Sequence, residues 1–113
     1  GGGVVSEPIV LLLSLPPSAN RLWRNNRLSP EYREWKQTAG WEAKTQLVGI
    51  PPIKGKFSAT IEVPEDRRDP DNNIKPVLDL CQAVGAIEND KLLGELHLYP
   101  IEREGVLVRL VAL

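Results

Sequence analysis

The residues best suited to chemistry in this 113-residue chain lie in the run RRDPDNNIKPVLDLC, which extends from Arg67 to Cys81. Asp69 and Asp71 are separated by one residue, and Asp90 lies on a later turn. Hard divalent cations, Mg²⁺ above all, bind oxygen ligands and keep several waters, so a few carboxylates beside a substrate phosphate make a typical site. The pattern therefore predicts a hydrolytic metal site in which Asp69, Asp71 and Asp90 are the ligands.

The charges around these aspartates leave two interpretations open. Lys75 could stabilise negative charge as it develops on a phosphate, and Arg67 and Arg68 could clamp the phosphate beside it. Alternatively, Lys75 forms an i, i+4 ladder of ion pairs with Asp71 and Asp79, and the aspartates serve only as turn and helix caps. Residue spacing is compatible with both.

Other residue types exclude several classes of site. One histidine, His97, and one cysteine, Cys81, do not supply the ligands of a zinc site. Cys81 falls on the apolar face of a predicted helix, which predicts a core position, and His97 falls on the polar face of a predicted strand. The chain has no Ser/His/Asp arrangement and no phosphate-cradling glycine loop. A single cysteine also excludes an internal disulfide and fits a reducing compartment.

Length and composition predict one globular domain. Hydrophobic residues make up 42% and charged residues 26% of the chain, both ordinary values. The longest apolar run, Ile9 to Leu13, is far shorter than the roughly 20 residues of a membrane span, and no signal peptide is recognisable. The three opening glycines and the absence of methionine suggest an engineered or trimmed start. We therefore expect a disordered or engineered segment over residues 1–7 and a single domain over 8–113.

The distribution of charge is more informative than its total of -1. Between Arg21 and Arg27 there are three arginines and no acid. We expect a long loop over residues 18–28, in which arginines beside Trp23 suit phosphate contact and base stacking; the alternative is an ordinary loop whose tryptophan packs on the core. The predicted DNA-contacting residues are Asn20, Arg21, Arg24, Arg27, Arg67, Arg68 and Asn72.

The first half of the chain contains two strands and a helix that can position these residues. A short apolar strand is predicted over residues 8–15, and prolines end it. Ser29 as N-cap and Pro30 at the first helical position begin a helix that runs to about Gln46. Trp35 and Trp41 are predicted to lie in the core or an interface. Residues 57–63 alternate between apolar and polar types, which predicts a half-buried strand.

The second half is predicted to contain one helix and two strands. Pro76 favours a helix that begins near Asn72 or Asn73, because proline costs little in a first turn; Asp69 and Asp71 would then stand ahead of it. Gly85 ends this helix. Strands over 95–101 and 106–113 are expected to form a hairpin through Gly105, with Pro100 on an edge strand. The predicted fold is α/β of the α+β type, a small mixed sheet of about four strands with two main helices, in the order β-α-β-α-β-β.

At these residues the chain resembles the RusA family of Holliday junction resolvases. The matching segments are Asp69-Pro70-Asp71-Asn72, Lys75-Pro76, Leu78-Asp79-Leu80, Gly85, Ile87 and Asp90, with Leu15-Pro16-Pro17-Ser18-Ala19-Asn20-Arg21 upstream. The resemblance implies a small α/β homodimer that binds four-way or otherwise branched DNA. It also implies paired nicks made with Mg²⁺, for which Mn²⁺ could substitute, in DNA recombination and repair. The implied setting is the cytoplasm of a bacterium or of a phage host, with no membrane.

The resemblance also assigns roles to individual residues. Asp69, Asp71 and Asp90 match the metal-binding carboxylates of the family, Lys75 its essential lysine, and Arg68 a basic position. Asn89 departs from the pattern, because family members often carry a second acid there. That departure favours one alternative, a branched-DNA binding protein with weak or no catalysis. The other alternative is a small interaction domain whose acids are caps and ion-pair ladders.

Overall fold

The computed structural model describes residues 7–17, 23–24, 27–64, 70–101 and 104–113, with the backbone alone at 23–24, 27–28 and 70–73. The main sheet contains β1 (Ile9–Leu13), β4 (Phe57–Val63), β5 (Leu93–Pro100) and β6 (Val106–Ala112). The two α-helices are α1 (Pro30–Gln46) and α2 (Pro70–Ala83). Two short strands, β2 (Trp23–Arg24) and β3 (Arg27–Leu28), pair with each other, and a 3₁₀ turn, η3 (Asp90–Leu92), precedes β5.

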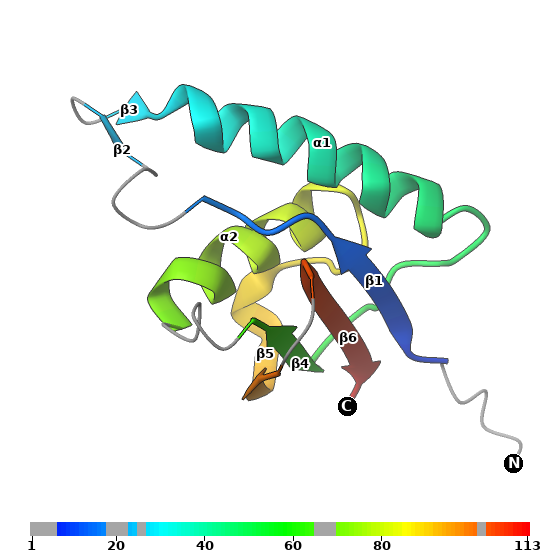
Figure 1. Cartoon of the computed structure of the whole chain (residues 1–113). Helices are drawn as coiled ribbons and strands as arrows, with labels where there is room; N and C mark the ends of the chain where they lie inside the picture. Colours follow the sequence, from blue (N-terminus) through cyan, green and yellow to red (C-terminus); the bar gives the residue numbers. More distant parts are fainter. Residues whose placement is uncertain (1–6, 18–22, 25–26, 65–69, 102–103) are drawn as a thin grey trace, which may run out of the picture.

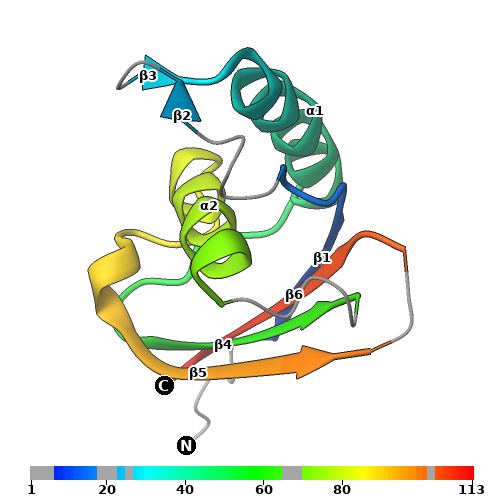
Figure 2. The ribbon, with the colours of Figure 1, turned by 60° about the vertical axis from the view of Figure 1, so that its left-hand side comes forward.

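The sheet has the order β1-β6-β4-β5, in which only β5 runs parallel to its neighbour β4. Both helices and the β2–β3 hairpin lie on one side of this sheet, and the other face is uncovered (Figures 1 and 2). The predicted fold class is therefore confirmed, with four strands in a mixed sheet, two helices and the expected order of main elements.

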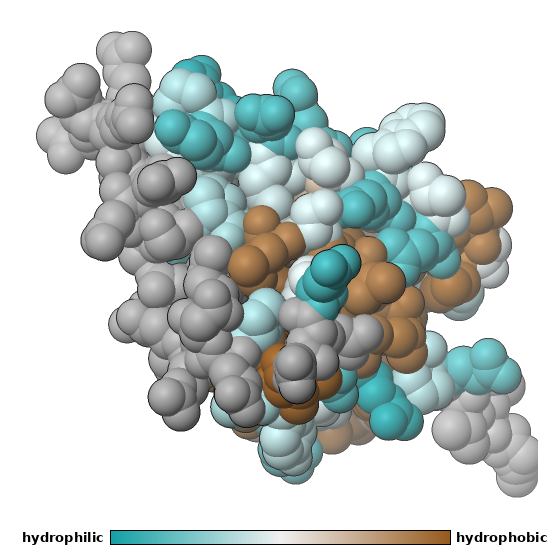
Figure 3. Space-filling view, in the orientation of Figure 1, coloured by the Kyte–Doolittle hydropathy of each residue, from teal (hydrophilic) through white to brown (hydrophobic). Residues whose placement is uncertain are grey.

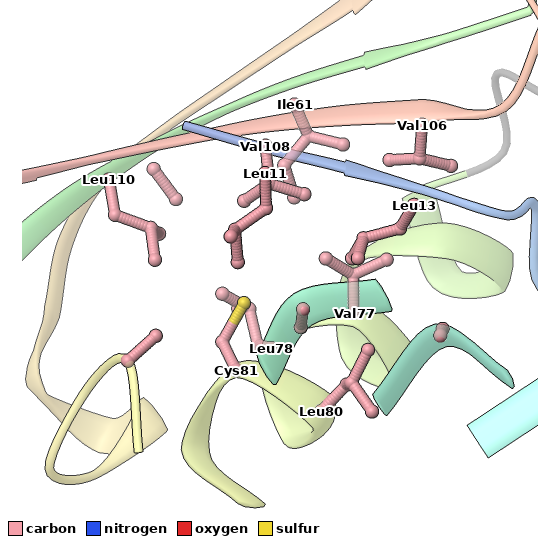
Figure 4. Close-up of a cluster of buried hydrophobic side chains, with 14 of the residues drawn as sticks. Leu11, Leu13, Ile61, Val77, Leu78, Leu80, Cys81, Val106, Val108 and Leu110 are labelled. Atoms are coloured by element: carbon pink, nitrogen blue, oxygen red, sulfur yellow. The ribbon is translucent and has the colours of Figure 1, made fainter. Parts of the chain in front are cut away.

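The hydrophobic core lies between the sheet and the helices. Alternate residues of β4 are fully buried, as the period-2 pattern predicted. Figure 4 shows Leu11, Ile61 and Val108 of three different strands directed toward α2, which contributes Val77 and Cys81. Burying apolar side chains on one face of each element stabilises the packing by roughly 25 cal/mol per Å². The opposite face of the sheet is thereby left to solvent.

Helix α1 begins and ends where the sequence predicted. The Ser29 hydroxyl accepts a hydrogen bond from the Tyr32 N–H at 3.2 Å, and the helix ends at Gln46. The Gln46 side chain then closes the outer edge of β1: it accepts from the Leu12 N–H and donates to the Leu12 carbonyl, each at 2.8 Å. This amide occupies backbone groups that another strand would otherwise pair with.

The expected hairpin between the last two strands is wrong. Strand β4 lies between β5 and β6, so these strands do not pair with each other. A parallel pair needs a crossover connection, and α2 supplies one between β4 and β5. Gly105 nevertheless adopts the expected positive φ of 75°, and Pro100 lies on an edge strand as predicted.

The predicted start of α2 is also wrong. The helix begins at Pro70, so Asp71 lies inside its first turn and Pro76 lies in its interior. Pro76 removes one backbone hydrogen bond of the helix, but its side chain is buried against the core. Burial of the ring offsets part of that loss, which the local rule did not include. The end is as predicted: the Gly85 and Ala86 N–H groups donate to Gln82 and Cys81 in a Schellman arrangement.

Two further predictions are corrected. Residues 23–28, expected within a loop, include the β2–β3 hairpin. Trp35 is buried, and its indole N–H donates to the Ser14 carbonyl at 2.7 Å, but Trp41 is 75% exposed and is not part of the core. The helical period accounts for this difference, because Trp41 lies on the side of α1 opposite Trp35, Ala39 and Ala43.

Candidate functional site

One face of α2 carries two polar residues that the sequence singled out, Asp71 and Lys75, and a third, Gln82, that it did not. Asp71, Lys75 and Gln82 follow one another at i, i+4 and i+11, and this spacing places all three on the same side of a helix. Lys75 and Gln82 are exposed, whereas Val77 and Leu78 on the other side are buried. Asp71 lies in the first turn, where unpaired N–H groups and the helix dipole favour negative charge.

Asp90 is held against this same face from the neighbouring turn. It begins η3 and is half-buried. Its backbone N–H donates to the Gln82 Oε1 at 2.9 Å. The Asn89 side chain caps the turn by accepting from the Lys91 N–H at 2.9 Å. Gln82 and Asn89 therefore fix the position of Asp90 relative to α2.

Asn89, the departure from the family pattern, thus has a structural role. Asparagine and aspartate are equivalent as caps, so an acid at this position would keep the cap and add a charge. Glu88 does not replace that acid beside Asp90, because its Oε1 accepts from the Gly55 N–H at 3.0 Å. Asp90 is consequently the acid of this turn whose backbone N–H is bonded to α2.

Lys75 has no ion-pair partner among the residues whose side chains are described. In particular, Lys75 and Asp79 do not form the ion pair of the predicted i, i+4 ladder. Asp79 instead affects Tyr32 of α1: burial raises the pKa of Tyr32, and the negative charge of Asp79 raises it further. Lys75 is exposed, and the other predicted ion pair, with Asp71, lies outside the described side chains.

Asp71 and Gln82, the residue bonded to the Asp90 backbone, lie near opposite ends of α2. Gln82 follows Asp71 at i+11, which corresponds to about 16 Å of helix at roughly 1.5 Å per residue. Asp90 approaches the Gln82 end of this face, and Lys75 lies between the two ends. The side chain of Asp71 is outside the described part of the chain, so a shared metal ion remains a prediction.

Several predicted site residues lie outside the described residues altogether. These are Asp69, Arg67, Arg68, Asn20 and Arg21. The backbone is described for Arg24 and Arg27 in the β2–β3 hairpin and for Asn72 in α2. Sequence reasoning missed Gln82, although its position on the same helical face as Lys75 was a signal that could have identified it.

The donor types near this face suit a hard cation. Cys81 is fully buried in the core, where burial raises the pKa of its thiol from 9.0 to about 12. His97 lies on β5, exposed, with its Nε2 3.8 Å from Glu95. Neither the Cys81 thiol nor the His97 imidazole therefore accompanies the aspartates as a ligand. The remaining donors are oxygens, which Mg²⁺ prefers. The described residues alone contain no group of three potential metal ligands.

Fold and site together define a class of protein. It is a small α+β domain in which one helix, α2, carries charged residues from its N-terminal turn onward. No family model matches the chain. It is 35% identical to the crossover junction endodeoxyribonuclease RusA of Aquifex aeolicus (strain VF5), over 92% of this chain and 91% of the relative. The chain belongs to the RusA family. Neither described helix has the length and apolar character needed to cross a membrane.

Proposed function

We propose that this protein is an Mg²⁺-dependent endonuclease that resolves Holliday junctions by paired nicks in DNA recombination and repair. The observation that carries this proposal is the identity of 35% over 92% of the chain to a relative named as a crossover junction endodeoxyribonuclease. The polar face of α2 supports the proposal physically, because it combines the exposed ammonium group of Lys75 with the proposed aspartate ligands. Mn²⁺ is the expected substitute ion, and the cytoplasm is the expected location.

The residues of the polar face of α2 and its neighbouring turns have different proposed roles in phosphodiester hydrolysis. Asp69, Asp71 and Asp90 would hold the ion, and a bound Mg²⁺ polarises the phosphate and lowers the pKa of a bound water. Lys75, which is exposed and unpaired among the described side chains, binds the phosphate and stabilises charge that develops on it. Gln82 and Asn89 keep Asp90 in place, so less ordering is needed when substrate binds.

DNA contacts are proposed for the basic residues at the same side of the sheet. Arg24 and Arg27 belong to the β2–β3 hairpin, which lies with α2 on the helical side (Figures 1 and 2). Arginine binds phosphate through two parallel hydrogen bonds and reads geometry as well as charge. With Asn20, Arg21, Arg67, Arg68 and Asn72, these residues complete the proposed DNA-binding set.

A homodimer is proposed because paired nicking needs two active sites. The uncovered face of the sheet is the surface that supports it: Val10 and Leu12 of β1 are 50% and 49% exposed, and apolar side chains gather over β1 in Figure 3. A hollow of 540 Å³ on this face is lined by residues that include Glu62 and Arg109. Two copies related by a twofold axis can place Arg109 near the partner's acidic side chains.

The second candidate function is a branched-DNA binding protein with weak or no catalysis. Asn89 is the observation that favours it, because the turn before β5 then offers one acid fewer than is common in the family. The same residue caps the turn and holds Asp90 in position. Geometry at Asp90 is thus preserved, which supports the catalytic proposal over this alternative.

Cleavage of a synthetic four-way junction during an Mg²⁺ titration tests the proposal. We expect Asp90→Asn to abolish paired nicking while junction binding without metal remains. Asp79→Asn is the matched control, because Asp79 is an exposed acid of α2 outside the proposed ligand set. Retained cleavage by Asp90→Asn would refute the assigned site. Junction binding by the wild type without cleavage under Mg²⁺ or Mn²⁺ would establish the second candidate instead.

A further inference from the structure

A groove between α1 and α2, separate from the polar face of α2, combines an exposed aromatic ring with two cations. Trp41 is 75% exposed on α1, a large exposure for the side chain with the greatest apolar area. Lys36 and Lys44 flank it on the same helix, and both are exposed. Leu80 of α2 and Val84, which directly follows that helix, form the opposite wall of a groove of 290 Å³.

Gly40 of α1 also lines this groove. It is buried, and a Cβ added there would lie at ordinary contact distance, 3.7 Å, from the Leu80 Cδ1. Gly40 therefore adds no side chain to the groove beside Leu80. A shallow, open shape suits a flat ring that stacks on the indole rather than an enclosed small molecule.

The charge of the groove is positive. Its lining includes Lys36 and Lys44, and none of the described residues that line it is acidic. Two acids of the helices have interactions outside the groove: the Glu42 carboxylate accepts from the N–H and the hydroxyl of Ser14 at 2.9 and 3.0 Å, and the charge of Asp79 acts on Tyr32. Glu34 lies on the same side of α1 as Trp41 but does not line the groove. A polyanion would therefore meet two lysines and no acid among the described residues that line the groove.

We propose that this groove binds an unpaired nucleotide strand, with a base stacked on Trp41 and phosphates contacted by Lys36 and Lys44. Single-strand binding sites combine these two features, because every base has a face that stacks on an aromatic ring. The proposal rests on the proposed function for its biological setting, since a branch point is where bases become unpaired. The groove would add a second DNA contact, on a different side of α2 from Lys75 and the Asp90 turn.

The test measures binding of an oligo-dT strand and of two four-way junctions, one fully paired and one with unpaired thymines at the branch. We expect Trp41→Ala to weaken binding of oligo-dT and of the unpaired junction by about 5-fold to 100-fold, the range for removing one stacked base. Trp41→Phe should retain most of the binding while the quenching of tryptophan fluorescence by oligo-dT falls. Val48→Ala is the control, because Val48 is 81% exposed near the end of α1 and does not line the groove.

The lysines are tested by salt dependence. We expect Lys36→Ala with Lys44→Ala to reduce the slope of log affinity against log salt for oligo-dT by about 0.7 for each phosphate that is no longer neutralised. Lys54→Ala with Lys56→Ala is the matched control, because both lysines are exposed and outside the groove. An unchanged slope together with unchanged oligo-dT binding in Trp41→Ala would overturn the proposal.

Two outcomes separate the groove from the proposed function. If the wild type cleaves junctions and Trp41→Ala alters neither oligo-dT nor junction binding, the groove proposal is wrong and the nuclease proposal stands. If Trp41→Ala changes the sedimentation mass but not DNA binding, the groove is a protein interface and the nucleotide proposal is overturned. Binding of oligo-dT that depends on Trp41 in a protein that cleaves no junction would support the groove alone.

Discussion

Gln82→Ala is the variant that most directly tests how the fold positions the candidate site. Gln82 carries no charge and is not a proposed ligand, but its Oε1 accepts from the Asp90 N–H at 2.9 Å. Alanine is a better helix former than glutamine, so α2 itself is not weakened. The change therefore removes one tie between α2 and the turn that bears Asp90.

The size of the effect follows from that single hydrogen bond. One hydrogen bond contributes about 0.5 to 1.5 kcal/mol net, and this exposed N–H can bond to water instead, which favours the lower half of that range. Since about 1.4 kcal/mol corresponds to tenfold, the equilibrium constant for holding Asp90 in position should fall by a factor of about 2 to 5. We expect the Mg²⁺ concentration for half-maximal junction cleavage to rise, by at most the same factor.

The assay is an Mg²⁺ titration of junction cleavage, with junction binding in the absence of metal as a second measurement that should not change. Gln46→Ala is the control, because it also removes a glutamine amide that bonds to backbone, in this case the N–H and carbonyl of Leu12. It should lower the free energy of unfolding by about 1.5 to 3 kcal/mol, because three exposed hydrogen bonds are removed, one of them to the Glu42 carbonyl, and leave the Mg²⁺ dependence unchanged. An unaltered Mg²⁺ dependence in Gln82→Ala, or an equal change in both variants, would refute the reasoning.

Three further predictions concern the cap, a turn and the core. Asn89→Asp should keep the cap and lower the Mg²⁺ concentration needed for junction cleavage, whereas Asn89→Ala should raise it; an Mg²⁺ titration of each variant distinguishes them. Gly105→Ala should lower the free energy of unfolding, measured with urea, by more than Gly55→Ala does. Both glycines have a positive φ, 75° and 78°, which costs alanine about 1 to 2 kcal/mol at each position. Only at Gly105 would the added Cβ lie 2.6 Å from the Leu13 carbonyl oxygen. Cys81 should not react with thiol reagents at about pH 8 in the folded protein, because burial raises the pKa of its thiol from 9.0 to about 12. The stability that this raised pKa contributes is complete below pH 9.0 and is lost as pH rises toward 12. Cys81→Ala should reduce that alkaline loss of stability.

Elements governed by local patterns were predictable from the sequence. The alternation over residues 57–63 predicted the span of β4, and Ser29 with Pro30 predicted the start of α1. Local rules were insufficient where tertiary packing decides. Burial of Pro76 lets α2 begin at Pro70, which a rule about backbone hydrogen bonds alone does not foresee.

Candidate site residues divide in the same way. Residue types and spacing predicted Lys75 and Asp90 as site residues; in the structure Lys75 is exposed on α2 and the Asp90 backbone is bonded to Gln82 of the same helix. Gln82 was missed because its importance arises from a contact between two elements. The groove at Trp41 was missed because the tryptophan was predicted to lie in the core or an interface, although its position opposite the apolar stripe of α1 indicated exposure.

Strand order explains why Asp90 depends on α2 for its position. Because β5 runs parallel to β4 and Leu93 pairs with Phe57, Asp90 lies near the beginning of β4, whereas α2 follows the end of that strand. The crossover helix spans the intervening length and returns the chain toward Asp90. A hairpin of β5 with β6 would not require this geometry, so the insertion of β4 between them is what brings the Asp90 turn to the Gln82 end of α2. The parallel pairing of β4 with β5 therefore determines which end of α2 the Asp90 turn approaches.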